Sequence, residues 1–206
     1  MGHTREKKPV AYAEEAKKES AKIAEDFADF GEGIRVLFLV HRSKEGVLHK
    51  DRHLRSIITQ SFFEWRDAIG ELLEEKSRHQ FSSMLRIYSS VNSRNLSKAV
   101  LTFKHEQIDA EHGPHKRDFY IDIKSRFISC LMRPANRDES FFNFDVDDGL
   151  TLDEALKVLE ACEEKPQIVK QYATKNGWHI ITMPFNYTKL SKPIPMQKDS
   201  LLLLKF

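Results

Sequence analysis

Residues 142–147 alternate between apolar and polar side chains, and this run constrains the fold more than any other stretch of the chain. One side of it carries Phe142, Phe144 and Val146, and the other carries Asn143, Asp145 and Asp147. Alternation with a period of two is typical of a strand that buries one face. On the polar face Asp145 and Asp147 lie roughly 7 Å apart along the strand. Two carboxylates so close repel each other unless a cation lies between them, and hard oxygen ligands suit Mg²⁺ or Mn²⁺.

The segments that follow this strand predict a small sheet. A helix over 151–163 begins at a capping-box pattern. Two strands are expected over 168–174 and 178–183, joined by a turn at Lys175-Asn176-Gly177, because Asn-Gly tolerates positive φ. A link with a short crossover leads to a last strand over 200–206. This order of elements, βαββ(α)β, is that of a ferredoxin-like or RNA-recognition-like unit.

That topology predicts where polar residues from separate segments meet. The first strand would lie between the third and the fourth and antiparallel to both, so its C-terminal end would lie beside their N-terminal ends. Asp145 and Asp147 end the first strand, His179 begins the third, and Asp199 precedes the fourth. We therefore expect Asp145, Asp147, Asp199 and His179 to converge at one edge of the sheet.

The earlier part of the chain predicts a second unit, so the fold class is α+β. Periodicity indicates helices over 7–30, 54–73, 96–108 and 119–132, and strands over 34–40 and 85–91. We expect one compact, two-lobed domain. Its parts are an N-terminal amphipathic helix (1–32), an α/β unit (33–135) and an RNA-recognition-like catalytic unit (136–206).

The turn before residue 96 is a candidate phosphate site. Asn92, Arg94 and Lys98 surround the expected start of a helix, where backbone N–H groups and a guanidinium can hold a phosphate. Ordinary capping by a neighbouring Ser or Asn explains the same pattern without a ligand. Arg94, Lys98 and Lys175 are the candidates for stabilising charge on phosphates, with Arg94 first.

Composition narrows the classes of protein that fit. The net charge is only +2 with 31% charged residues, so any contact with nucleic acid must come from a local patch. Two cysteines, Cys130 and Cys162, exclude a zinc site built from cysteines and argue against a disulfide framework. No apolar run is long enough to span a bilayer, and the charged N-terminus is not a signal peptide. We therefore expect a cytoplasmic protein without a membrane partner.

Three short motifs resemble those of the archaeo-eukaryotic primase, or primase-polymerase, superfamily. The hydrophobic-Asp-x-Asp strand matches Phe144-Asp145-Val146-Asp147, and the small-residue-x-His strand matches Gly177-Trp178-His179. The late Asp matches Lys198-Asp199-Ser200. The resemblance covers residues 85–206, and the second motif more often has Ser where Gly177 stands. The small size is typical of a phage, plasmid or defence-system member or of a component of a larger replication assembly.

The resemblance implies a metal-dependent nucleotidyltransferase that extends a nucleic-acid 3′ end or makes primers. It implies that Asp145, Asp147 and Asp199 hold Mg²⁺ or Mn²⁺ and that His179 contacts the phosphates of the incoming nucleotide. Its expected partners are nucleoside triphosphates, a DNA or RNA template or primer, and other replication proteins. Two alternatives stay open: a metal-dependent nuclease or phosphohydrolase whose carboxylates activate water, and an inactive primase-like subunit that binds nucleic acid.

Overall fold

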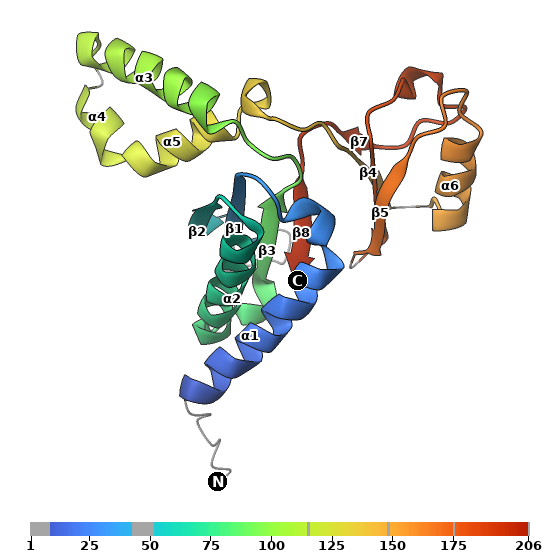
Figure 1. Cartoon of the computed structure of the whole chain (residues 1–206), viewed down its shortest axis with the longest axis horizontal. Helices are drawn as coiled ribbons and strands as arrows, with labels where there is room; N and C mark the ends of the chain where they lie inside the picture. The colour runs from blue at the N-terminus through green and yellow to red at the C-terminus, as the bar shows by residue number, and fades with distance from the viewer. Residues whose placement is uncertain (1–8, 43–51, 115, 148, 175, 206) are drawn as a thin grey trace. The chain divides into compact units, whose positions relative to one another are not determined.

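The computed structural model is a mixed α+β fold with two four-stranded sheets, which confirms the expected fold class (Figure 1). It describes residues 9–42, 52–114, 116–147, 149–174 and 176–205. The chain forms two compact units, one made of residues 1–89 with 202–206 and the other of residues 90–201. The second unit begins before the helices that follow residue 95, whereas the sequence groups those helices with the first. None of the described helices is long and apolar enough to cross a membrane.

The first unit consists of a sheet in the order β2-β1-β3-β8 with helices α1 and α2. Its elements are α1 (Pro9–Asp26), η1 (Ala28–Phe30), β1 (Arg35–His41), β2 (Arg52–Thr59), α2 (Phe62–Arg78), η3 (Ser82–Met84), β3 (Leu85–Ser90) and β8 (Leu201–Lys205). Strand β1 is antiparallel to both β2 and β3, and every residue of β1 is buried. A fully buried strand needs partners on both edges, because its backbone N–H and C=O groups cannot reach water.

Strand β2 corrects the prediction of one helix over residues 54–73. Leu54, Ile57 and Ile58 fit a helical stripe, yet residues 52–59 pair with β1 along its whole length. The helix begins only at Phe62, where the Ser61 hydroxyl accepts a hydrogen bond from the Glu64 N–H. Pairing with β1 outweighs the local helical spacing, and the β-branched Ile57 and Ile58 favour the strand.

The second unit consists of a sheet in the order β5-β6-β4-β7 and four α-helices within the described residues. Its elements are α3 (Leu96–His112), α4 (Lys116–Ile121), α5 (Ile123–Leu131), η4 (Pro134–Asn136), β4 (Phe142–Val146), α6 (Leu152–Glu160), β5 (Ile168–Ala173), β6 (Trp178–Thr182), η5 (Tyr187–Lys189) and β7 (Met196–Gln197). The predicted order of strand, helix, strand and strand is confirmed. Helix α6 begins at the predicted capping box of Thr151 and Glu154. The single helix expected over 119–132 is instead divided between α4 and α5.

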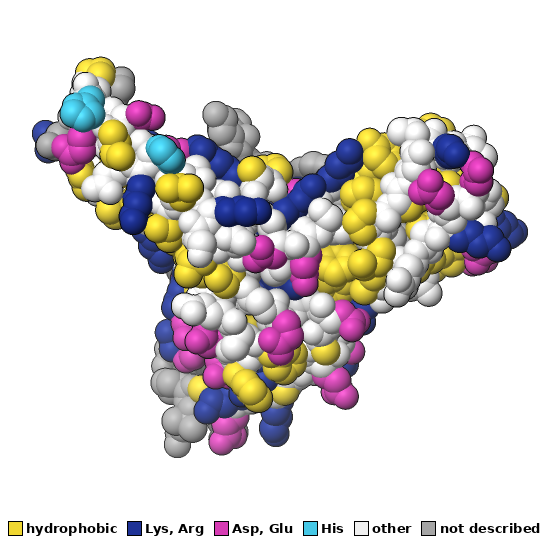
Figure 2. All heavy atoms as spheres, turned by 45° about the horizontal axis from the view of Figure 1, so that its top comes forward, with side chains coloured by type: hydrophobic (Ala, Val, Ile, Leu, Met, Phe, Trp, Pro, Cys, Tyr) yellow, Lys and Arg dark blue, Asp and Glu magenta, His cyan; other side chains and the backbone are white. Residues whose placement is uncertain are grey.

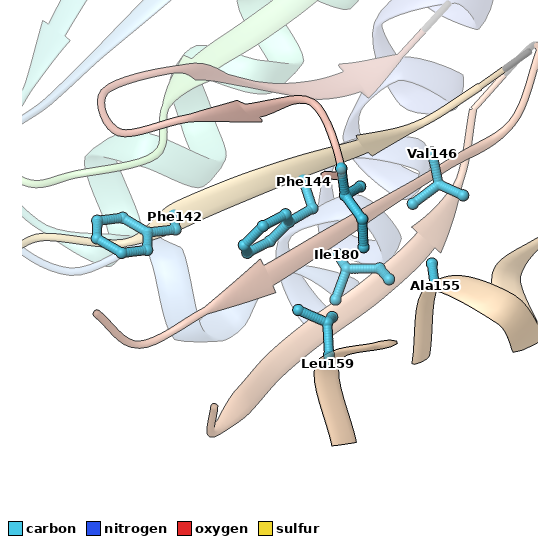
Figure 3. Packing of buried hydrophobic residues seen from close by; sticks show 7 residues of the cluster. Phe142, Phe144, Val146, Ala155, Leu159 and Ile180 are labelled. Carbon is cyan, nitrogen blue, oxygen red and sulfur yellow. The ribbon is translucent and has the colours of Figure 1, made fainter. Parts of the chain in front are cut away.

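Strand β4 separates an apolar core from a polar face. Phe142, Phe144 and Val146 are buried on the side that helix α6 covers (Figure 3). The same cluster contains Ala155, Leu159, Ile180 and Ile194. Because side chains alternate along a strand, Asn143 and Asp145 lie on the opposite face of β4. Asp147, directly after the strand, continues the same alternation. The predicted alternation is therefore the feature that positions the site.

The fourth strand of this sheet is not the one that the sequence predicts. Residues 201–205 form β8 beside β3 in the first sheet, and the two-residue strand β7 takes the expected place beside β4. In this antiparallel pair Asn143 lies opposite Gln197, and Phe144 lies opposite Met196. The chain after Gln197 therefore runs toward the beginning of β4. Asp199 falls at the level of about residue 141, four residues or roughly 13 Å along the strand from Asp145.

Candidate functional site

Asp145 and His179 are direct cross-strand neighbours on β4 and β6. His179 Nε2 lies 3.3 Å from Asp145 Oδ1, and the two side chains are 16% and 38% exposed, respectively. Asp145 Oδ1 itself is buried, so the other carboxylate oxygen is the one that faces solvent. The structure thus brings together two of the predicted site residues, with the imidazole mostly buried and the carboxylate accessible.

Tyr172 on β5 completes this row of the sheet. It is the cross-strand neighbour of His179, and its hydroxyl lies 2.9 Å from His179 Nδ1. The two rings meet edge to face, with their centroids 5.2 Å apart. The Asp145 carboxylate can only accept a hydrogen bond, so we assign the imidazole proton to Nε2, and Nδ1 then accepts from the Tyr172 hydroxyl.

The charge of His179 follows from its surroundings. Burial lowers the pKa of the imidazole, the nearby charges of Asp145 and Asp147 raise it, and burial has the larger effect. The pKa of His179 therefore lies below its usual value, so the neutral form of the ring predominates at pH 7. A neutral ring with its proton on Nε2 remains a hydrogen-bond donor at the edge of the acidic site.

Gly177 brings the turn between β5 and β6 against the end of β4. A Cβ atom at this position would lie 2.1 Å from the Val146 carbonyl oxygen and 2.2 Å from Asp147 Oδ1. Among the described glycines, positive φ occurs at Gly33 and Gly149, so Gly177 is required by this close approach rather than by its backbone conformation. Asp147 therefore lies next to the turn that leads into His179.

The turn is stabilised by two hydrogen bonds between its ends. The Thr174 N–H donates to the Gly177 carbonyl at 2.8 Å, and the Gly177 N–H donates to Thr174 Oγ1 at 3.1 Å. The predicted hairpin is confirmed in this form. Lys175, the predicted phosphate contact, lies outside the described residues.

Asp199 pairs with Arg94 instead of joining Asp145, which corrects the expected convergence of three acids. Arg94 Nη1 and Nη2 donate to Asp199 Oδ2 and Oδ1 at 2.9 and 2.7 Å, and Asn92 Nδ2 donates to Oδ1 at 3.1 Å. The Arg94 side chain is fully buried, and that of Asp199 is 10% exposed. The physical reason is the pairing of β7, which directs Asp199 toward the other end of β4.

Asn92 and Arg94 are thus part of a buried, hydrogen-bonded cluster within the second unit. Asn92 Oδ1 accepts the Phe141 N–H at 2.6 Å, and Asn92 Nδ2 also donates to the Lys198 carbonyl at 3.2 Å. The Val91 N–H donates to the Ser200 carbonyl at 3.1 Å. In this arrangement the predicted nucleotide contacts of Asn92 and Arg94 are taken by protein groups.

The start of α3 is capped in the ordinary way. Asn95 Oδ1 accepts a hydrogen bond of 2.9 Å from the Lys98 N–H, as in a standard N-cap. The Lys98 side chain is exposed on α3. The alternative reading of this segment, a helix cap without a ligand, therefore describes its geometry.

The oxygen atoms of the site fit a divalent cation of the magnesium type. Within the described residues, no group of three or more His, Cys, Asp or Glu side chains is arranged to hold a metal. Mg²⁺, however, is commonly bound by one or two carboxylates together with substrate phosphates and water. Asp145 Oδ1 is buried with His179 Nε2 3.3 Å away, and the other carboxylate oxygen, which faces solvent, is the one that could bind a cation.

Tyr172 is the site residue that sequence reasoning missed. Counting outward from the predicted three-residue turn at 175–177 pairs Ala173, and not Tyr172, with His179. In the structure the register is shifted by one residue, so Tyr172 lies opposite His179 and shares its face of the sheet. The predicted hairpin therefore gave no signal for Tyr172.

Tyr172→Phe is expected to weaken the preference of the His179 imidazole for the tautomer that carries its proton on Nε2. Loss of one hydrogen bond of about 1 kcal/mol changes the tautomer ratio by about fivefold. Nitrogen-15 NMR of the imidazole measures this ratio directly, and the wild type should carry its proton on Nε2. Tyr187→Phe, which changes a tyrosine packed on Phe142 in the apolar core, is the matched control and should leave the ratio unchanged. A wild-type proton on Nδ1 would contradict the assignment.

Of the predicted residues, the structure gathers Asp145, Asp147 and His179, adds Tyr172, and keeps Asp199 apart. No protein-family model, curated protein or solved structure matches this chain. The polar face of β4 and β6 is therefore the part of the molecule from which a function has to be inferred.

Proposed function

We propose that this chain is a metal-dependent nucleotidyltransferase of the primase-polymerase type. The observation that carries the proposal is the contact between Asp145 and His179 on neighbouring strands, with Asp147 against the turn that precedes His179. These three residues belong to the first two motifs of the resemblance. A pair of carboxylates beside a neutral imidazole suits a nucleotide that arrives with its metal.

In this proposal Asp145 and Asp147 hold Mg²⁺ or Mn²⁺, and the phosphates of the nucleotide and water supply the other ligands. When bound, such a metal lowers the pKa of an attacking 3′-hydroxyl and offsets the charge on the leaving pyrophosphate. Asp199 takes no part, because its carboxylate is occupied by Arg94 and Asn92. The proposed site thus has two acidic side chains where the resemblance implies three.

His179 is proposed to donate its Nε2–H to a phosphate oxygen. Tyr172 fixes the ring from the other side, so the donor points toward the carboxylate where the phosphates would be held. A neutral donor suits this position, since it binds an anion without forming a permanent ion pair with Asp145. The phosphate contact would therefore need no cation from Arg94, which is buried elsewhere.

The proposed partners are nucleoside triphosphates and a DNA or RNA strand that serves as template or primer, within an assembly of replication proteins. Both cysteines are buried and free, which supports a reducing compartment such as the cytoplasm. The net charge near zero agrees with binding through a local site rather than a general basic field.

Incorporation of a labelled nucleotide by the purified chain tests the proposal. With Mg²⁺ or Mn²⁺, a template and either dNTPs or NTPs, we expect labelled product that disappears when the metal is chelated and returns when it is restored. Incorporation that survives chelation contradicts the proposal. In parallel, a labelled strand is incubated with metal but no nucleotide. Cleavage there would indicate the nuclease alternative, and binding without either product would indicate the inactive subunit.

A further inference from the structure

Strand β5 adds a cation to the polar face that carries the proposed site. Lys170 lies opposite Ile181, Tyr172 lies opposite His179, and the one register shift of this strand pair comes before Lys170. Side chains two positions apart on a strand point to the same face, so Lys170 shares the face of Tyr172 and His179. Lys170 is half-buried, whereas Gln171, which alternates to the other face, is exposed.

Lys170 is the single Lys or Arg among the described residues of β4, β5, β6 and β7. Two other cations of the second unit are engaged away from this face. Arg94 is buried in its ion pair with Asp199, and the Lys198 ammonium lies 4.9 Å from the centroid of the Tyr187 ring. An anion on the polar face of the sheet would therefore find its positive side chain at Lys170.

The proposed site needs such a side chain. Asp145 and Asp147 are acidic and His179 is mainly neutral, while a nucleoside triphosphate brings several further negative charges. A divalent metal offsets only part of this charge. On the side of the molecule seen in Figure 2, Lys and Arg side chains are scattered among acidic ones instead of gathered into one patch. The terminal phosphates thus depend on an individually placed cation rather than on a general basic field.

We propose that Lys170 binds the terminal phosphates of the nucleotide, so that the triphosphate lies across the sheet from β4 toward the edge strand β5. The inference rests on the proposed function and adds the direction in which the substrate lies. Neighbouring strands are about 4.8 Å apart, so phosphates that start at Asp145 would pass His179 before they reach the flexible Lys170 side chain. An ammonium has three donors, so it can hold a phosphate together with a second partner.

This direction decides where the leaving group goes. When the 3′-oxygen bonds to the α-phosphorus, the bond to the α,β-bridging oxygen breaks and pyrophosphate leaves with that electron pair, while the hydroxyl proton passes to water. Pyrophosphate would then leave over β5, with its charge stabilised by Lys170. The sugar and base would extend to the opposite side of Asp145.

A lysine on an edge strand also has a purely protective role, since it discourages pairing with strands of other molecules. That role does not depend on which face of the sheet carries the charge. Binding to phosphate does depend on the face, because only one face carries Asp145 and His179. Moving the charge by one residue along β5 therefore separates the two roles.

Calorimetric titration of the full chain with ATP, and separately with AMP, in the presence of Mg²⁺ tests the proposal. Lys170→Met keeps a long side chain but removes the charge, and it should weaken the binding of ATP by about tenfold or more, the loss expected for a hydrogen bond to a charged group. The binding of AMP should change by less than about twofold, because AMP has no terminal phosphates. Lys170→Gln should show the same difference between the two nucleotides.

The matched control is the double variant Lys170→Met with Gln171→Lys, which has the wild-type net charge but carries the lysine on the other face of β5. It should bind ATP as weakly as Lys170→Met, whereas Lys170→Arg should keep most of the affinity. Circular dichroism checks that each variant is folded.

The possible failures are distinguishable. A wild-type chain that binds neither nucleotide would contradict the proposed function and this inference together. Wild-type binding of ATP that Lys170→Met leaves unchanged, or that the double variant restores, would overturn the inference alone. An equal loss for ATP and AMP would overturn the proposed direction of the triphosphate.

Discussion

Asp199→Asn is expected to lower the free energy of unfolding by about 3–5 kcal/mol. The substitution keeps the shape of the side chain but removes its charge, and the fully buried Arg94 guanidinium is left without a counter-ion. Breaking a buried ion pair from one side costs far more than the pair contributes, because the remaining charge cannot return to water. Denaturant unfolding at pH 7, with the midpoint and slope compared to wild type, measures the loss.

The control for this experiment is an exposed pair in the same chain. Arg66 and Asp67 form an ion pair at 3.0 Å with side chains 38% and 69% exposed, so Asp67→Asn should cost less than about 1 kcal/mol. The double variant Arg94→Met with Asp199→Leu should recover much of the lost stability, because no unpaired charge remains. An Asp199→Asn protein with wild-type stability and no nucleotide incorporation would indicate that Asp199 is a metal ligand after all.

Asp145→Asn is expected to abolish nucleotide incorporation without lowering the free energy of unfolding, in contrast to Asp199→Asn. Incorporation should fall by about 10³-fold, the upper range for removal of one group that stabilises transition-state charge. The free energy of unfolding should stay within about 0.5 kcal/mol of wild type, since the carboxylate is 38% exposed and its loss also relieves repulsion from Asp147. Initial rates with Mn²⁺ give the first quantity, and denaturant unfolding gives the second.

Asp109→Asn on the exposed side of α3 is the control for general effects of removing a carboxylate. It should leave both quantities unchanged. Electron paramagnetic resonance of Mn²⁺ adds a reading that does not depend on turnover, because Asp145→Asn should release the ion that wild type binds with nucleotide. Full incorporation by Asp145→Asn would remove the proposed function, whereas the expected result for Asp199 would stand.

Local patterns in the sequence were sufficient for the elements around the site. The alternation over 142–147, the capping box at Thr151 and the hairpin before Gly177 each depend on residues within a few positions of one another. Each of these signals lies within the element that it specifies. Strand β4, helix α6 and the contact between Asp145 and His179 were therefore predictable.

The sheet that the last strand joins was not predictable in this way, because β8 pairs in the first sheet and β7 takes its expected place in the second. The run of four leucines over 201–204 has no alternation, so nothing local decides which sheet it joins, and its pairing with β3 is a tertiary choice. Strand β7 has two residues and leaves no pattern at all. The position of Asp199 depends on both strands, which is why the predicted meeting of three acids failed while the meeting of Asp145 and His179 was found.

The close packing around Gly177 limits which residues this position can accept. Serine, which the resembling motif more often carries there, needs a Cβ where the Val146 carbonyl oxygen is only 2.1 Å away. A serine at this position would require the hairpin to move off the end of β4, and Asp147 would then lose its neighbour. Substitutions in the surrounding loops should therefore be tolerated more freely than any substitution of this residue.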